Sequence, residues 1–107
     1  ILEEFWGDTV EIDDGARLTW MRQPHYYMGL YPYSYSAGLT VGTTVAQAIL
    51  EEGQPAVERW LKVLKAGGTV PPMELAKMAG VDMTKPEAIR KAVAYVGSLV
   101  DLVVDSF

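Results

Sequence analysis

The segment PYSYSAGLTVGTTVAQAILEE runs from Pro32 to Glu52 and is followed by Gly53. Proline is favoured in the first turn of a helix and glycine commonly ends one, so this segment is predicted to be a single long helix. Its apolar side chains recur at helical spacing and form one face: Val41, Val45, Ala48 and Ile49. Small residues recur at every fourth position: Ser34, Gly38, Gly42 and Ala46. We expect another helix or a ligand to approach closely along this stripe.

Three further helices are expected downstream of the long one. The first covers residues 55–66, and the second covers residues 72–79, with Gly80 as its C-terminal cap. The apolar face of the first consists of Val57, Trp60, Leu61 and Leu64. The last helix is expected to begin with a capping box, in which Thr84 is the cap and Glu87 lies three residues later.

The last segment, residues 84–107, fits two kinds of secondary structure. Its apolar positions follow helical spacing to the end of the chain: Ile89, Ala92, Val93, Val96, Val100, Val103 and Val104. Several of them are β-branched, which lowers helix propensity, so a strand is the competing interpretation. A helical repeat sustained over about twenty residues favours the helix. The chain is therefore predicted to be all-α, with four to five helices joined by short loops.

An acidic lead-in, a short helix and a loop are predicted ahead of the long helix. Residues 1–14 hold six of the 14 acidic side chains. Residues 15–23 have helical composition, with Asp13 or Asp14 as the cap and a proline directly after them. Residues 25–30 are expected to form the loop that leads into the long helix.

The composition is that of one acidic globular domain or a piece of a larger one. Nine Lys and Arg against 14 Asp and Glu give the 107 residues a net charge of -5, which argues against nucleic-acid binding. The absence of cysteine excludes disulfides and thiolate metal sites. A single histidine excludes a zinc site built on two or three histidines of this chain. No apolar run approaches the roughly 18 residues that span a bilayer, so no membrane partner is expected.

The stretch from His25 to Gly38 is the candidate for chemistry, because it holds five of the six tyrosines. Phenol and imidazole groups can stabilise an oxyanion that develops at a reacting carbonyl. On a helix, Tyr31 and Tyr35 share one face and Tyr33 points about 160° away from each. Plainer interpretations stay open, since tyrosines of this kind are often partly buried core and a lone histidine is often only a hydrogen-bonded loop residue.

The run WMRQPHYYMGLYPYSYSAG, from Trp20 to Gly38, resembles the His/Tyr segment of oligoendopeptidase F and its thimet-oligopeptidase-like relatives. The shared elements are a tryptophan, a Pro-His-aromatic-Tyr element and a Tyr-x-Tyr-x-Tyr run that leads to Ala37-Gly38. Downstream, Ala-Gly-Gly at 66–68, Pro-Met-Glu-Leu at 72–75 and Ala-Gly-Val-Asp at 79–82 follow in the family's order. The resemblance therefore covers essentially all 107 residues.

This resemblance implies a mostly helical zincin-type peptidase with a deep channel that admits only short peptides. In that family, two histidines of an HExxH helix and a later glutamate hold zinc, and the HExxH glutamate activates a zinc-bound water. The chain has no HExxH, so the resemblance implies that residues 1–107 are the C-terminal helical segment of the catalytic domain. Zinc would then belong to the full-length enzyme, with none bound by this fragment, which would be inactive alone. The resemblance further implies short peptide substrates and a cytoplasmic location.

The resemblance also implies roles for individual residues. His25 matches the family's histidine, which contacts the substrate near the scissile bond. The resemblance implies that His25 and Tyr35 are the catalytic residues of this segment. Tyr35 matches the last tyrosine of the run and is the expected oxyanion donor. Tyr33 is the next candidate for substrate binding. Tyr27 is a further one, although the loop between the histidine and the tyrosine run differs in length among relatives.

A standalone helical module that binds a protein or a peptide is the alternative function. Tyrosine is favoured at interfaces, so the tyrosines would form the contact surface of such a module. The chain begins at Ile1 rather than with methionine, which we take to favour a piece of a longer protein. We expect such a piece to expose apolar surface and to self-associate through its tyrosine face or its last helix.

Overall fold

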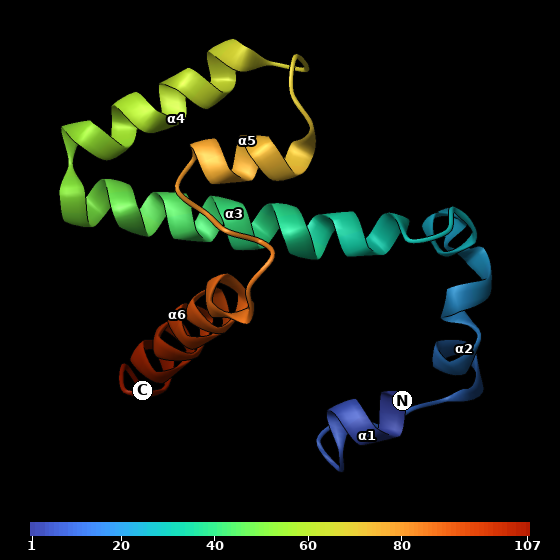
Figure 1. The fold of residues 1–107 in the computed structure, drawn as a ribbon. Coiled ribbons are helices and arrows are strands. Elements are labelled where there is room, and N and C mark those ends of the chain that lie inside the picture. The colour runs from blue at the N-terminus through green and yellow to red at the C-terminus, as the bar shows by residue number, and fades with distance from the viewer. The chain divides into compact units, whose positions relative to one another are not determined.

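The structure is a computed structural model that describes residues 1–107, and it is all-α, as predicted (Figure 1). In chain order the elements are α1 (Leu2–Trp6), α2 (Asp14–Arg17), the 3-10 turns η1 (Thr19–Arg22) and η2 (Pro24–Tyr27), α3 (Tyr31–Glu52), α4 (Gln54–Ala66), α5 (Pro72–Met78) and α6 (Pro86–Val104). The chain divides into two compact units, the N-terminal unit (Ile1–Tyr35) and the helical unit (Ser36–Phe107). None of the helices is long and apolar enough to cross a membrane.

The core lies in the helical unit and is built mainly from small apolar side chains. Its buried cluster consists of Val45, Val63, Ala79, Val81 and Ala88, with Val41, Ile49, Trp60, Leu75 and Met83 packed against it. The predicted apolar face of α3 is confirmed at Val41, Val45 and Ile49, which belong to this cluster or pack against it. Ala48, the fourth predicted member, lines a surface hollow instead. Burying these side chains removes apolar surface from water, which is the main term that holds the helices together.

The predicted face of α4 is only partly correct. Trp60 packs against the core, but Leu61 and Leu64 are 44% and 57% exposed. Ala56 and Val63 are buried in their place. The buried side of α4 is thus the i, i+4, i+7 row through positions 56, 60 and 63, which is an equally regular helical row. The apolar spacing permitted the predicted row through Leu61 and Leu64 as well as the row through Ala56 and Val63. Packing against the neighbouring helices selected the row through Ala56 and Val63.

The predicted helix ends are confirmed at the glycines. Gly53 follows α3 with φ of 68°, and Gly80 lies just after α5 with φ of 90°. Only glycine adopts such left-handed conformations without steric cost, so both positions end a helix and turn the chain. At Gly53 the backbone N–H still donates to the carbonyl of Ile49 at 3.0 Å, which satisfies one of the last carbonyls of α3.

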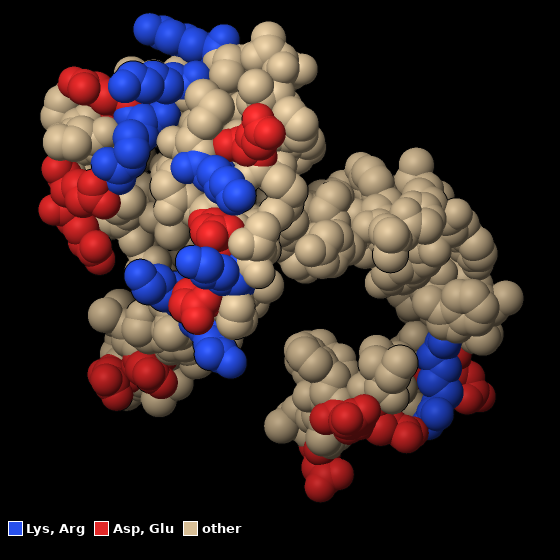
Figure 2. Space-filling view, in the orientation of Figure 1, with Lys and Arg blue, Asp and Glu red and all other residues tan.

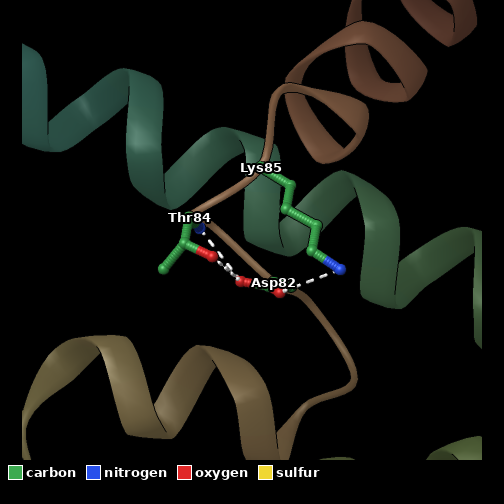
Figure 3. Close-up of polar contacts among 3 residues, drawn as sticks. All are labelled: Asp82, Thr84 and Lys85. Carbon is green, nitrogen blue, oxygen red and sulfur yellow. Dashed lines mark hydrogen bonds and ion pairs between the residues drawn. The ribbon is translucent and has the colours of Figure 1, made fainter.

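The predicted capping box at Thr84 is wrong, because Thr84 lies outside the last helix. The helix begins at Pro86, and its N-cap, Lys85, makes no side-chain hydrogen bond to it. Thr84 instead donates from its hydroxyl and its backbone N–H to Oδ1 of Asp82, at 2.5 and 3.0 Å (Figure 3). Proline takes the first helical position because it lacks an N–H and has a fixed φ, so the helix and its cap lie one residue later than predicted.

Helix α6 is confirmed as a helix rather than a strand, but most of its apolar side chains are not covered. Ala88 and Ala92 are buried. The predicted face is otherwise exposed to 47–66%, at Ile89, Val93, Val96, Val100, Val103 and Val104. The helix therefore leaves an apolar face open to solvent.

In the N-terminal unit, the predicted helix over 15–23 is divided into two short pieces. Asp13 caps α2 as expected and accepts a hydrogen bond from the Ala16 N–H at 2.6 Å. The α-helix then ends at Arg17, and η1 follows as a 3-10 turn. None of these residues is buried, so no packing offsets the cost of extending a short helix. Helix α1, in the acidic lead-in, was not predicted.

Candidate functional site

The candidate residues lie on η2 and on the first turn of α3, within the N-terminal unit. His25 and Tyr27 belong to η2, where the expected loop begins with a 3-10 turn. Tyr33 and Tyr35 belong to the start of α3. Between the two elements Leu30 has φ of 55°, a left-handed conformation that costs a non-glycine residue roughly 1–2 kcal/mol. Leu30 thus lies in the short connection between His25 of η2 and Tyr31, the first residue of α3, whose rings are in contact.

His25 contacts Tyr31, a residue to which the sequence assigned no role. The two rings stack with centroids 5.3 Å apart and planes 13° from parallel. Tyr31 also meets Tyr35 edge-on, with centroids 5.4 Å apart and an interplanar angle of 79°. The hydroxyls of Tyr31 and Tyr35 are 3.1 Å apart and share a hydrogen bond in which either can donate. The expectation that these two tyrosines share a helix face is thus confirmed, and Tyr31 links the two predicted catalytic residues.

Tyr27 and Tyr33 stand outside this chain of contacts. The Tyr27 hydroxyl donates to the backbone carbonyl of Met21 at 3.1 Å, which ties η2 to η1. Its one proton is used in that bond, while the oxygen can still accept. Tyr33 is 67% exposed and keeps its hydroxyl free for a ligand. The four predicted residues therefore fall into a linked pair, His25 with Tyr35, and two separate tyrosines.

The stretch of sequence that carries the pair lacks acidic and basic side chains other than His25. No Asp, Glu, Lys or Arg occurs between Gln23 and Leu50. Figure 2 shows the charged side chains gathered over other parts of the chain. The hydrogen bond with the Tyr31 hydroxyl raises the pKa of Tyr35 above that of an ordinary phenol, because it favours the protonated form. Tyr35 is therefore a neutral hydrogen-bond donor throughout the physiological pH range.

The pair is open to solvent rather than enclosed. Tyr35 is 61% exposed, and no residue of the two elements that precede it is buried. A binding pocket normally surrounds most of its ligand. The segment by itself therefore forms no enclosed pocket. The sequence signal that could have found Tyr31 is its i, i+4 spacing to Tyr35.

A separate hollow lies in the helical unit. It measures about 400 Å³ and is lined by side chains of α3, α4 and α6, among them Glu51, Arg59, Lys91 and Tyr95. None of the predicted site residues lines it. Arg59 is already paired with Glu52 at 2.7 Å across its wall. The hollow is thus a polar surface groove whose guanidinium is occupied.

The residues present do not fit a zinc site. No three His, Cys, Asp or Glu side chains are grouped closely enough to hold a metal ion. A structural or catalytic zinc needs at least three such ligands from the protein. The one histidine of the chain lies against the Tyr31 ring instead.

Several known proteins are similar to this chain. It is 42% identical over 90 residues, 84% of its length, to "Oligopeptidase PepF" of Bacillus subtilis. It is 31% identical over 93 residues, 87% of its length, to an "Oligoendopeptidase F homolog" of Borreliella burgdorferi. It is also 31% identical over 90 residues, 84% of its length, to "Group B oligopeptidase PepB" of Streptococcus agalactiae. The chain spans only 13%, 16% and 15% of the lengths of these three relatives.

No solved structure matches the chain. The family model described as "Peptidase family M3" matches residues 1–95, which include the His/Tyr segment, all helices up to α5 and about the first half of α6. The resemblance noted in the sequence is thereby confirmed over both units. The chain belongs to peptidase family M3.

Proposed function

We propose that residues 1–107 are the C-terminal helical segment of the catalytic domain of an oligopeptidase that hydrolyses short peptides. Membership of peptidase family M3 and relatives named oligopeptidases and oligoendopeptidases support this function. The segment supplies side chains that bind the substrate and stabilise the oxyanion. The peptide is the partner, and neither nucleic acid nor a membrane is needed for the reaction.

One observation carries the proposal, namely the contact chain from His25 through Tyr31 to Tyr35. It places an imidazole and a phenol on one exposed, uncharged surface. Neutral donors on a low-polarity surface stabilise a developing oxyanion well, because no counter-ion competes for them. They also suit the peptide backbone, whose groups are neutral hydrogen-bond donors and acceptors.

Within this function each predicted residue has a role that its contacts permit. Tyr35 donates a hydrogen bond to the oxyanion. The hydrogen bond with Tyr31 raises the pKa of Tyr35, so its hydroxyl stays protonated. His25 contacts the substrate near the scissile bond. Tyr33 binds the peptide through its free hydroxyl. Tyr27 contributes its ring and its oxygen lone pairs, because its hydroxyl already donates a hydrogen bond to the backbone carbonyl of Met21.

The metal of such an enzyme would be held by residues outside these 107. We therefore propose that the isolated chain is catalytically inactive and binds no stoichiometric zinc, which the full-length enzyme would contain. Incubation of the isolated chain with zinc, followed by metal analysis, tests this directly. One zinc per chain, or peptide cleavage by the chain alone, would contradict it. The cytoplasmic location of the enzyme stays a prediction.

The decisive experiment is Tyr35→Phe in the complete peptidase that contains this segment. Removing one oxyanion donor is expected to lower kcat by about 10²–10³-fold, with the zinc content unchanged. Tyr26→Phe is the matched control, because Tyr26 is equally exposed, at 60%, and takes no part in the contact chain. Normal turnover of Tyr35→Phe would refute the assignment of Tyr35 as oxyanion donor.

A helical interaction module is the second candidate function. The observation in its favour is the exposed apolar face of α6, which a stable solvent-facing helix does not need. This face and the tyrosine face are the two surfaces through which the isolated chain would self-associate. The two candidates differ in what Tyr35→Phe does, because an interaction module predicts altered association and no effect on peptide hydrolysis.

A further inference from the structure

We propose that Tyr31 is a positioning residue that holds His25 and Tyr35 as one unit for the reaction, an inference that rests on the proposed function. Its ring stacks on the imidazole, and its hydroxyl bonds the Tyr35 hydroxyl. Its side chain thus contacts both of them. Tyr31 thereby acts on the substrate through its two neighbours.

Burial distinguishes Tyr31 from the other tyrosines of the segment. It is 38% exposed, whereas Tyr26, Tyr27, Tyr33 and Tyr35 are between 60% and 67% exposed. Its ring stacks on the imidazole and makes a T-shaped contact with the Tyr35 ring. Tyr31 therefore has less surface left for a ligand than the other four tyrosines. Its position suits support of the neighbouring rings rather than direct contact with the substrate.

The backbone fixes the stack at the place where the chain turns. The Met28 N–H donates to the carbonyl of His25 at 3.3 Å, and the Tyr31 N–H donates to the carbonyl of Met28 at 3.1 Å. These two bonds close consecutive turns, and the second contains the left-handed Leu30. The two turns join His25 to Tyr31 through a hydrogen-bonded main chain, and the two rings stack.

The shared hydrogen bond gives Tyr31 a second effect. A phenol has one proton to donate and lone pairs to accept, and either hydroxyl of this pair can be the donor. When Tyr31 donates, the proton of Tyr35 is free to point at a substrate oxygen. When no substrate is present, Tyr35 can donate to Tyr31 and remain protonated. Tyr31→Phe keeps the ring contacts and removes only the hydrogen bond between the two hydroxyls.

The geometry can be tested without any activity, in the 107-residue chain itself. Tyrosine ring carbons are followed by NMR as the pH is raised, in the unaltered chain, in Tyr31→Phe and in the control Tyr26→Phe. The pKa of Tyr35 is expected to fall toward the ordinary phenol value in Tyr31→Phe, because the Tyr31 hydrogen bond that raises it is gone. The ring-current shift of His25 should persist in Tyr31→Phe and disappear in Tyr31→Ala. An unchanged Tyr35 titration in Tyr31→Phe would overturn the proposal.

The role in catalysis is tested in the complete peptidase. Tyr31→Phe is expected to lower kcat by about 3–10-fold, the effect of one neutral hydrogen bond, with KM nearly unchanged. Because Tyr35 must be protonated to donate, the loss of activity at alkaline pH should also move to lower pH. Tyr31→Ala should lower kcat further and raise KM, since His25 loses its stack. If Tyr31→Ala does not fold, Tyr31→Phe still decides the question.

The outcomes separate this proposal from the proposed function. A large loss of kcat in Tyr35→Phe with an unaltered pH profile and kcat in Tyr31→Phe would overturn the positioning role and leave the oligopeptidase function intact. Normal kinetics in both variants would overturn the proposed function and the positioning role together. We expect kcat to fall in both Tyr35→Phe and Tyr31→Phe. Only in Tyr31→Phe should the loss of activity at alkaline pH move to lower pH.

Discussion

The core of the helical unit can be tested with one substitution made at a buried and at an exposed position. Val45 in α3 is 6% exposed, and Val93 in α6 is 66% exposed. Both lie inside long helices, so Val→Ala at either position brings the same gain in helix propensity, about 0.5 kcal/mol. The difference between the two variants therefore reports burial alone.

The expected difference follows from the burial of the two side chains. Each substitution removes two carbons, worth about 0.8 kcal/mol apiece when fully buried, so Val45 loses about 1.5 kcal/mol and Val93 about 0.5 kcal/mol. At Val45 a cavity is also left among Val63, Val81 and their neighbours, which adds about 1 kcal/mol if the site collapses only partly. Val45→Ala should thus lower the free energy of unfolding by about 2 kcal/mol more than Val93→Ala.

The assay is urea unfolding of the 107-residue chain, followed by circular dichroism of the helices. In a chain of this size 2 kcal/mol corresponds to a difference in Tm of roughly 8–16 °C, so thermal melting gives an independent reading. The slope of the urea transition should be the same for both variants, because neither changes the surface exposed on unfolding. A difference in unfolding free energy below about 0.5 kcal/mol would refute the placement of Val45 in the core.

Two further predictions concern the turn before α6 and the face of that helix. The hydroxyl and the N–H of Thr84 hold the pKa of Asp82 below its ordinary value by bonding the charged carboxylate, so Thr84→Ala should raise that pKa, measured by NMR titration. The stabilisation from a lowered carboxyl pKa is complete above the ordinary pKa and is lost as pH falls through the lowered one, so the two chains should differ least at acidic pH. Val100→Lys should reduce the average mass of the isolated chain in light scattering, and a monomer at all concentrations before substitution would contradict self-association through α6.

Helix ends were the part of the fold most readily predicted from sequence. Gly53 and Gly80 stand at positions that need a left-handed backbone, and the prolines stand in first turns. These signals are local, because they depend on the φ angle and the N–H group of one residue. The predicted boundaries of α3, α4 and α5 accordingly differ from the observed ones by only one residue.

The sequence was not sufficient to predict the start of α6, where two local signals competed, or the buried face of α4, which packing determined. Thr84 with Glu87 and Pro86 each mark a helix start, and the structure follows the proline. On α4, the rows through Leu61 and through Val63 are both apolar, and only the neighbouring helices determine which one is buried. A choice of this kind depends on residues distant in sequence, so helical periodicity alone does not contain it.

The candidate site was predictable to a similar extent. The spacing of Tyr31 and Tyr35 predicts a shared helix face, and their hydroxyls do meet. The stack of His25 on Tyr31 was not predictable, because it depends on Leu30 adopting a positive φ. Leucine seldom does so, and nothing in its neighbours signals it. The sequence therefore indicated the shared face of Tyr31 and Tyr35 but not the contact of Tyr31 with His25.

The uncharged stretch from Gln23 to Leu50 links the fold of the chain to its proposed function. Exposed helices usually carry charged side chains, and a stretch of this length without them is poorly suited to face bulk water on every side. The same property suits one wall of a cleft, because neutral phenol and imidazole groups act most strongly where water is excluded. In the proposed function the exposure of Tyr35 has an explanation. We expect a peptide and the opposite wall of the cleft to cover this tyrosine in the complete enzyme.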